Sequence, residues 1–235
     1  MARRISTGIT GLDPLMEGGF IKGASILVTG GAGTGKTIFG LQFLWEGLKR
    51  GEPGVYITLE EEVDEIRADA IRFGWDFSEY EKKNLFRIVY YDPLQVNEMG
   101  INVVDDIGRT NAQRVVVDSI SIVGMMLPNE MQVRKKLISM INSIKRTGAT
   151  SVLISEVLDS DEKGLSRFGV EEFVVDGVIA LYYFGIGDNI TRSLMLRKMR
   201  RTNQGTGIYG FNIGKTGIDV YNPEDKTPSA VQEYK

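Results

Sequence analysis

Neither cysteine nor histidine occurs among the 235 residues of this chain. The absence of cysteine excludes disulfide bonds and thiolate chemistry, and the absence of histidine removes the usual general base and the commonest metal ligand. Any hydrolytic chemistry must therefore rest on carboxylates, lysines, arginines and a metal ion.

Long apolar runs and a strong net charge are missing as well. No apolar run approaches the roughly 18 to 20 residues that span a bilayer, and residues 1–5 lead directly into turn formers without a signal-peptide pattern. Lysine and arginine number 28 against 31 aspartates and glutamates, a formal net charge of -3. No overall field attracts nucleic acid, although a local basic patch remains compatible with this balance. We expect a cytoplasmic protein without membrane contact.

Residues 30–37 match the phosphate-binding motif G-x-x-x-x-G-K-[ST] in full. An apolar run at 25–29 precedes the motif and a helical pattern at 38–50 follows it. Glycines let backbone N–H groups point at phosphate oxygens, Lys36 brings a charge to the β- and γ-phosphates, and Thr37 offers a hydroxyl to Mg²⁺. The alternative is a glycine-rich turn with a chance Lys-Thr pair, which both flanks argue against. The predicted nucleotide ligands are Gly31, Ala32, Gly33, Thr34, Gly35, Lys36 and Thr37.

A second acidic position follows the motif by some eighty residues. The apolar run at 114–118 predicts a buried strand that ends in Asp118. In a phosphate-binding site of this kind, such a strand-end carboxylate holds the hydrated Mg²⁺ opposite the hydroxyl of the loop. We therefore predict Thr37 and Asp118 as the metal site.

The order of elements predicts an α/β fold. Strand patterns at 25–29, 55–59, 85–91, 114–118 and 151–155 alternate with helical patterns, which is typical of a parallel sheet. The strands expected at 177–185, 193–199, 208–213 and 218–221 are joined by short turns, so the sheet should gain antiparallel strands there. We expect one domain over residues 1–221 and a polar tail over 222–235.

Several strings of residues, taken in order, resemble the KaiC family of RecA-like ATPases. The resemblance runs from about residue 5 to about residue 221 and implies a RecA-like P-loop NTPase fold, ATP and Mg²⁺ as ligands, and a homo-oligomeric ring, typically a hexamer, with ATP between neighbouring subunits. The strings that carry it are Ser6-Thr7-Gly8-Ile9-Thr10-Gly11-Leu12-Asp13, the phosphate loop, Thr58-Leu59-Glu60-Glu61, Val117-Asp118-Ser119, Phe168-Gly169-Val170-Glu171-Glu172-Phe173 and Leu196-Arg197-Lys198-Met199-Arg200.

The resemblance also implies catalytic residues. Glu60 and Glu61 match a pair of catalytic glutamates, which would orient and deprotonate the attacking water. The alternative for both is the acidic first turn of a solvated helix. Lys198 and Arg200 match a Lys-x-Arg pair presented to the γ-phosphate of the neighbouring subunit, and positions i and i+2 of a strand project to one side. The alternative for them is a basic cluster that solvates an edge or touches nucleic acid.

Three further positions match nucleotide-lining positions of the family. Thr202 and Lys215 are expected to reach the nucleotide from the adjacent subunit, and Arg72 to approach the adenine. Ser155 and Glu156 would lie near the γ-phosphate as a sensor, although a serine at a strand end is also an ordinary cap.

The function expected from these features is Mg²⁺-dependent ATP hydrolysis in a ring that regulates an unknown protein partner. One alternative is a DNA-binding ATPase similar to RecA or RadA, and another is a nucleotide-gated scaffold with little turnover. The loop at 159–167, which corresponds to a DNA contact, carries three acids and two bases. This balance repels phosphate, so a nucleic-acid partner is not favoured.

Overall fold

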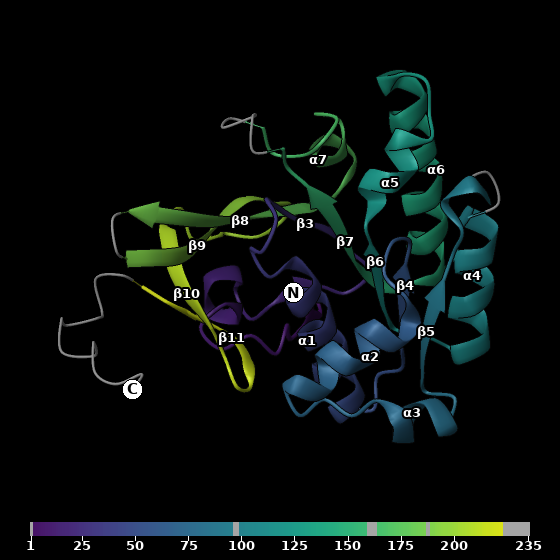
Figure 1. Cartoon of the computed structure of the whole chain (residues 1–235), viewed down its shortest axis with the longest axis horizontal. Helices are drawn as coiled ribbons and strands as arrows, with labels where there is room; N and C mark the ends of the chain where they lie inside the picture. The colour runs from purple at the N-terminus through teal and green to yellow at the C-terminus, as the bar shows by residue number, and fades with distance from the viewer. Residues whose placement is uncertain (1, 96–98, 159–163, 187–188, 223–235) are drawn as a thin grey trace.

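The structure, a computed structural model, describes residues 2–95, 99–158, 164–186 and 189–222 (Figure 1). Its main sheet has nine strands within these residues, and β1 and β2 pair in a small second sheet. The strands are β1 (Arg4–Ile5), β2 (Phe20–Ile21), β3 (Ser25–Gly30), β4 (Gly54–Thr58), β5 (Phe86–Tyr90), β6 (Arg114–Asp118), β7 (Thr150–Glu156), β8 (Gly177–Ile186), β9 (Asn189–Met199), β10 (Ile208–Gly214) and β11 (Gly217–Tyr221).

The strand order across the main sheet is β11-β10-β9-β8-β3-β7-β6-β4-β5. Strands β3 to β7 pair in parallel, whereas β9, β10 and β11 join through antiparallel pairs, so the expected mixed sheet is confirmed. The change of direction comes one strand later than expected, because β8 pairs in parallel with β3 and antiparallel with β9. The chain leaves β7 on one side of β3 and returns on the other side in the same direction.

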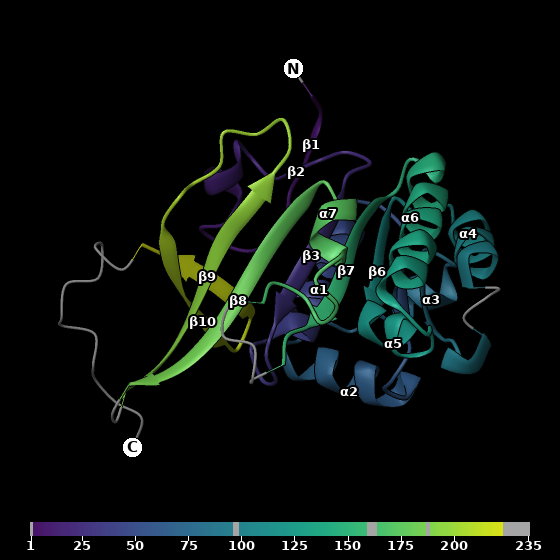
Figure 2. The same cartoon turned by 90° about the horizontal axis from the view of Figure 1, so that it is seen from above.

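Helices cover both faces of the sheet. Figure 2 shows α4 and α6 at the right of the view and β8 and β9 extending to the lower left. The buried residues of α1 and α2 belong to one apolar cluster and those of α4 and α6 to another. The helices are α1 (Lys36–Lys49), α2 (Val63–Arg72), α3 (Ser78–Lys82), α4 (Met99–Thr110), α5 (Ile120–Met125), α6 (Glu130–Thr147) and α7 (Glu171–Val174), with short 3₁₀ turns at Asp13–Met16 and Pro93–Gln95.

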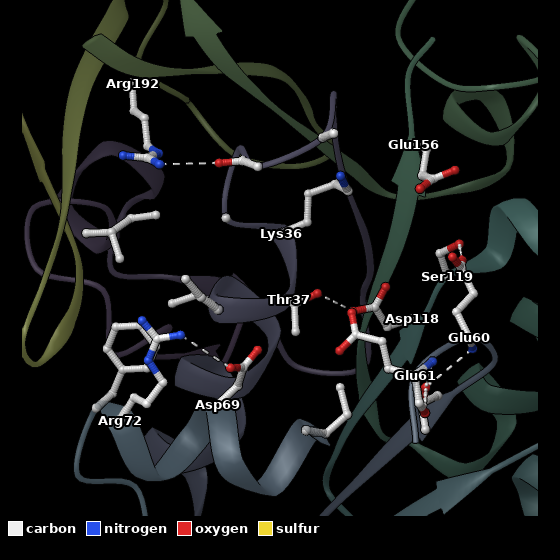
Figure 3. Close-up of a pocket in the computed structure, with 18 of the residues that line it drawn as sticks. Lys36, Thr37, Glu60, Glu61, Asp69, Arg72, Asp118, Ser119, Glu156 and Arg192 are labelled. Atoms are coloured by element: carbon white, nitrogen blue, oxygen red, sulfur yellow. Dashed lines mark hydrogen bonds and ion pairs between the residues drawn. The ribbon is translucent and has the colours of Figure 1, made fainter. Parts of the chain in front are cut away.

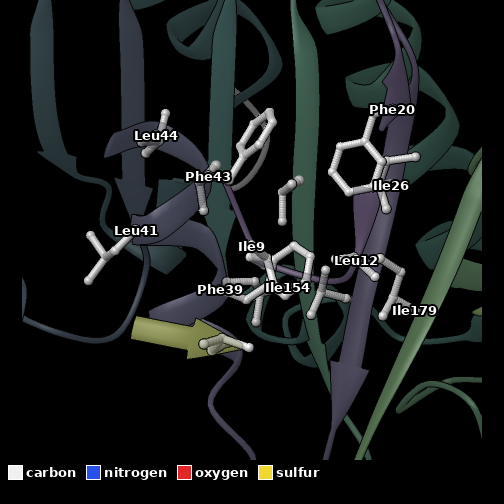
Figure 4. Close-up of a cluster of buried hydrophobic side chains, with 14 of the residues drawn as sticks. Ile9, Leu12, Phe20, Ile26, Phe39, Leu41, Phe43, Leu44, Ile154 and Ile179 are labelled. Carbon is white, nitrogen blue, oxygen red and sulfur yellow. The ribbon is translucent and has the colours of Figure 1, made fainter. Parts of the chain in front are cut away.

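The apolar strands are buried on both faces, as expected for parallel strands under helices. Ile26 and Val28 of β3 pack into the cluster with α1, whereas Leu27 between them packs into the cluster with α6. This alternation follows from the two-residue period of a strand. Figure 4 shows Phe39 of α1 beside Ile154 of β7 in the first cluster.

Local capping motifs set the starts of α6 and α2. Asn129 caps α6, because its side chain accepts a hydrogen bond from the backbone N–H of Gln132 at 3.0 Å. Glu62 and Glu65 form a capping box at the start of α2. Each motif satisfies N–H groups that a helix start leaves without a partner. Helix α2 therefore begins directly behind the glutamates that follow β4.

The parallel strands bring their carboxyl ends to one edge of the sheet. The phosphate-binding loop follows β3, Glu60 and Glu61 follow β4, and Asp118 ends β6. In open α/β sheets, ligands bind in the crevice at this edge. Among the described residues, no helix is long and apolar enough to cross a membrane. Most of the tail expected at 222–235 lies outside the described part of the chain.

Candidate nucleotide site

The phosphate-binding loop turns sharply from β3 into α1. Gly33 and Gly35 have φ angles of 69° and 97°, a region in which a side chain is strained. A Cβ atom at Gly35 would also lie 2.8 Å from Ile213 Cδ1 of β10. Glycine at position 35 therefore serves both the turn and the close approach of β10 to the start of α1.

Lys36 bends back over the loop that carries it. Its Nζ donates to the carbonyl oxygen of Gly31 at 2.8 Å. Burial lowers the pKa of Lys36, and the negative charges of Asp118, Glu156 and Glu60 oppose that shift. A lysine ammonium thus lies beside the loop, within reach of an anion held there.

Asp118 joins two hydrogen-bond donors from separate elements. Its Oδ2 accepts from Thr37 Oγ1 at 2.7 Å and from the Tyr56 hydroxyl at 2.6 Å. Burial raises the pKa of Asp118, while these two hydrogen bonds favour its ionised form. The structure thus brings the two predicted metal ligands together. Tyr56 was missed, because in the sequence it is one more apolar residue of a buried strand.

The oxygen pair of Thr37 and Asp118 suits Mg²⁺. This ion prefers hard oxygen ligands and is commonly bound through one or two protein oxygens, substrate phosphates and water. Within the described ranges, no group of three histidine, cysteine, aspartate or glutamate residues could hold a metal by itself. The donor set therefore fits an ion that arrives with a phosphate group.

Glu60 and Glu61 lie at the same edge, with different partners. Glu60 Oε1 accepts from the Ser119 hydroxyl at 2.5 Å, and the Thr58 hydroxyl donates to the carbonyl oxygen of Glu61 at 2.7 Å. Burial is the main cause that raises the pKa of both carboxyls, and nearby acids add to the effect. A raised pKa makes a carboxylate a better proton acceptor near neutral pH. Ser119 belongs to a string that carries the KaiC resemblance, but no site role was expected for it.

These groups line one cavity of about 730 Å³, a volume within the usual range for small-molecule sites. The loop and the strand ends form its inner part, and α2 and the turn between β10 and β11 form its outer part. The lining residues are Ala32, Gly33, Gly35, Lys36, Thr37, Ile38, Thr58, Glu60, Glu61, Ile66, Asp69, Arg72, Phe73, Asp118, Ser119, Glu156, Arg192, Ile213, Gly214 and Lys215.

Arg192 of β9 is a cationic lining residue that lies in none of the sequence motifs. Its guanidinium lies over the ring of Tyr183, 4.3 Å from the centroid, and Nη2 donates to the carbonyl oxygen of Gly33 at 3.4 Å (Figure 3). The chain thus supplies a second cation to its own phosphate-binding loop. The sequence offers no signal that separates Arg192 from the other basic residues of this region.

Lys198, Arg200 and Thr202 lie outside this cavity of their own chain. Lys198 Nζ donates to the carbonyl oxygens of Glu172 and Val175 at 2.9 and 2.7 Å. Thr202 Oγ1 accepts from Arg4 at 2.8 Å. The expectation that Lys198 and Arg200 project from one strand is not met, because β9 ends at Met199 and Arg200 begins the following turn.

Arg200 and Lys215 have different surroundings. Arg200 Nη1 lies 3.7 Å from Asp176 Oδ1, at the far end of β9. Lys215 lines the cavity of its own chain, in the turn between β10 and β11, whereas it was expected to reach the nucleotide from a neighbour. The antiparallel β10–β11 pair causes this difference, because it folds the turn back beside the chain's own α1. Arg72 also lines the cavity, and its approach to adenine stays a prediction.

Ser155 and Glu156, the two residues expected near the γ-phosphate, point in different directions. Glu156 lines the cavity, whereas Ser155 is fully buried, with its hydroxyl 3.3 Å from the hydroxyl of Ser121 and 3.3 Å from Glu171 Oε1. Adjacent strand residues point to opposite faces, which accounts for the contrast. Ser155 therefore belongs to a buried polar cluster.

Known proteins match this chain over nearly its whole length. The family described as the KaiC ATPase matches residues 5–225. The chain belongs to the KaiC ATPase family. A UPF0273 protein of Pyrococcus horikoshii is 37% identical over 94% of this chain and 95% of its own length. The crystal structure of a KaiC-like protein from the same organism has a TM-score of 0.86 and 39% identity, covering 94% of this chain and all of that one.

The circadian clock members of the KaiC family are longer than this chain. The clock oscillator protein KaiC of Parasynechococcus marenigrum is 32% identical over 93% of this chain, which spans 45% of that protein. This chain thus covers one KaiC-like domain with a P-loop NTPase fold. Family membership and fold confirm the resemblance from the sequence, and they make nucleotide binding the function class to test.

Proposed function

We propose that this KaiC-like protein binds ATP with Mg²⁺ and hydrolyses it in a homo-oligomeric ring in which neighbouring copies complete each site. One observation carries the proposal. Lys36, Thr37, Asp118 and Glu60 converge on one cavity, while Lys198 and Arg200 lie outside the cavity of their own chain. A cation pair that cannot serve its own site is suited to the site of a neighbour.

The phosphate chain binds at the inner end of the cavity. Backbone N–H groups of the loop and the first turn of α1 hold the phosphate oxygens. Lys36 gives up its contact with the Gly31 carbonyl and turns to the phosphates. An ammonium binds a charged phosphate oxygen more strongly than a neutral carbonyl oxygen. Thr37 and Asp118 would hold Mg²⁺, whose positive charge offsets the charge of the phosphates.

Glu60 is the proposed general base. It takes a proton from the attacking water, whose oxygen bonds to the γ-phosphorus while the bond from that phosphorus to the bridging oxygen breaks and ADP leaves. Ser119 fixes the carboxylate of Glu60, and burial raises its pKa toward the working range of a base. Glu61 follows in the chain and assists in holding the water.

The neighbouring copy supplies Lys198 and Arg200 to the transferring phosphoryl group. Cations at that place stabilise the charge of the transition state, an effect worth roughly 10³ to 10⁵ in rate for an arginine finger. A head-to-tail contact, in which one surface meets a different surface of the next copy, closes into a ring when the rotation between successive copies adds up to a full turn. Hydrolysis then depends on assembly, which makes the protein suitable for regulating a partner.

The test mixes two inactive variants, Lys36→Ala and Arg200→Ala. In a randomly mixed ring, about a quarter of the contacts join an intact phosphate loop to an intact cation pair. We expect phosphate release near that fraction of the wild-type rate, with none from either variant alone. The control mixes Lys36→Ala with the double variant Lys36→Ala/Arg200→Ala, which has no intact site. Light scattering on the same samples measures assembly.

Three outcomes would contradict the proposal. Full activity of Arg200→Ala alone would exclude the cation's role, and a mixture as inactive as its control would exclude action between copies. A chain that binds ATP without measurable turnover would favour a nucleotide-gated scaffold. Binding to single-stranded DNA that falls steeply with salt would favour a RecA-like function instead.

A further inference from the structure

The outer end of the cavity has apolar walls that suit a nucleotide base. Ile66 of α2 and Phe73, which directly follows the last residue of α2, line it, and Ile38 of α1 and Ile213 of β10 line it as well. An aromatic base stacks or packs on such surfaces, whereas phosphates are held by N–H groups and cations. A nucleotide whose phosphates lie on the loop therefore places its base between α2 and the β10–β11 turn.

Asp69 lies within the apolar face of α2. Positions 66, 69 and 73 are spaced by three and four residues, so the three side chains share one side of the helix. Figure 3 shows Asp69 and Arg72 on α2 at the edge of the cavity, joined by an ion pair of 3.7 Å. The Asp69 side chain is 47% exposed and that of Arg72 is 80% exposed.

The other acids of the cavity lie elsewhere. Glu60 is held by Ser119, Asp118 by Thr37 and Tyr56, and Glu156 ends β7, all at the inner end. Glu61 follows β4, before the first turn of α2. Among the described lining residues, Asp69 is thus the acid that α2 carries into the base end of the cavity.

We propose that Asp69 selects nucleotides whose purine carries an exocyclic amino group. This inference rests on the proposed nucleotide binding. An ionised carboxylate only accepts hydrogen bonds, so it binds an N–H group of the base and repels a carbonyl oxygen. The amino groups of adenine and of guanine both offer such a donor. Hypoxanthine, the base of inosine, has a carbonyl at position 6 and no exocyclic amino group, so its ring N1–H is the donor that remains on that edge.

Arg72 supports the carboxylate of Asp69. Its guanidinium lies one helical turn further along α2, with Nη1 3.7 Å from Asp69 Oδ1, and this ion pair orients the carboxylate. The pair leaves an oxygen of Asp69 available to the base, since a carboxylate accepts through two oxygens. Arg72 is therefore a positioning residue for the proposed contact, and Asp69 is the group that touches the ligand.

The experiment measures dissociation constants of the full chain for β,γ-imido triphosphates with Mg²⁺, so that hydrolysis plays no part. The ligands are the adenosine, guanosine, inosine and 2′-deoxyadenosine forms, with inorganic tripolyphosphate as a base-free probe. We expect an amino-bearing purine to bind about tenfold more tightly than the inosine form, the size of one hydrogen bond to a charged group at a partly exposed site. Comparing the adenosine and guanosine forms shows which of the two amino groups Asp69 binds.

Asp69→Ala should abolish this preference and leave the affinity for tripolyphosphate unchanged. Asp69→Asn, which keeps the shape and one acceptor, should retain part of it. The matched control is Asp64→Ala, because Asp64 lies on the same helix with a side chain that is 93% exposed and paired with Arg67. The control should keep the wild-type ratio between the amino-bearing and inosine forms.

Two results would overturn the assignment of Asp69. The first is a preference for the amino group that persists in Asp69→Ala or is absent from the wild type. The second is a change confined to the ratio between the adenosine and 2′-deoxyadenosine forms, which would assign Asp69 to the ribose. Failure of every ligand, tripolyphosphate included, to bind the wild type would instead contradict the proposed function itself.

Discussion

Gln42 of α1 binds the backbone of Ile218 with both atoms of its side-chain amide. Its Nε2 donates to the Ile218 carbonyl oxygen at 3.1 Å, and its Oε1 accepts from the Ile218 N–H at 2.7 Å. The same Nε2 donates to the carbonyl oxygen of Gly8 at 2.9 Å. One buried side chain thus joins the helix after the phosphate loop to β11 and to the N-terminal segment.

Gln42→Leu should lower the free energy of unfolding by about 2–4 kcal/mol. The substitution leaves buried backbone groups without partners, and each such loss costs about 1–3 kcal/mol. Urea unfolding measures the change, with Gln132→Leu on the exposed side of α6 as the control. If both variants unfold at the wild-type midpoint, the three hydrogen bonds contribute nothing to stability.

Glu60→Gln should reduce ATP turnover by about 10²- to 10⁴-fold and leave ATP affinity nearly unchanged. A general base contributes a factor of that size, and glutamine keeps the shape while losing the ability to take a proton. Steady-state phosphate release and a binding titration measure the two quantities. A turnover that stays within twofold of the wild type would exclude Glu60 as the base.

The pH dependence of turnover tests the environment of Glu60. Because burial raises the pKa of Glu60, the acid limb of kcat/KM should lie above the ordinary glutamate value of 4.5. The rate falls as pH drops through this pKa, since the base must be ionised. Ser119→Ala removes a hydrogen bond that lowers the pKa of Glu60, so the limb should move to higher pH. A limb that moves down, or stays in place, contradicts the assignment.

Lys198→Met should slow hydrolysis by about a thousandfold if Lys198 acts with Arg200 on the transferring phosphoryl group. Its loss also removes two hydrogen bonds to backbone carbonyls, which should lower stability by about 1–2 kcal/mol. Turnover is therefore measured well below the unfolding temperature of the variant. Arg197→Met, at the adjacent exposed position of β9, should keep the wild-type rate. Equal rates for the two variants would assign Lys198 a structural role alone.

Tyr56→Phe should lower stability by about 1–3 kcal/mol at pH 7, because it removes a donor from the buried carboxylate of Asp118. The hydrogen bond favours ionised Asp118, so its removal raises the pKa of that group further. The deficit should shrink as pH falls and Asp118 becomes protonated in both proteins. Unfolding curves at pH 7 and at the lowest pH at which the wild type stays folded measure this, with Tyr90→Phe as a surface control. A deficit that grows on acidification would have the wrong sign.

Local features made much of the fold and of the site predictable. The two-residue period of the strands, the Asn129 cap of α6 and the glycines of the phosphate loop each act over a few residues, so the sequence shows them directly. The strand-end position of Asp118 follows from the same periodicity. The change in sheet direction was placed one strand too early, because the partners of a strand are not set by its own pattern.

The sequence by itself determined the phosphate loop, the alternation of strands and helices, and the acids that end the strands, since these depend on neighbouring residues. Only the tertiary structure decided which side chains surround those acids. Tyr56 and Ser119 meet their acidic partners across 62 and 59 residues, and Arg192 reaches the loop across 159 residues. Such contacts form only when the sheet aligns its strand ends, because their geometry comes from packing between distant segments.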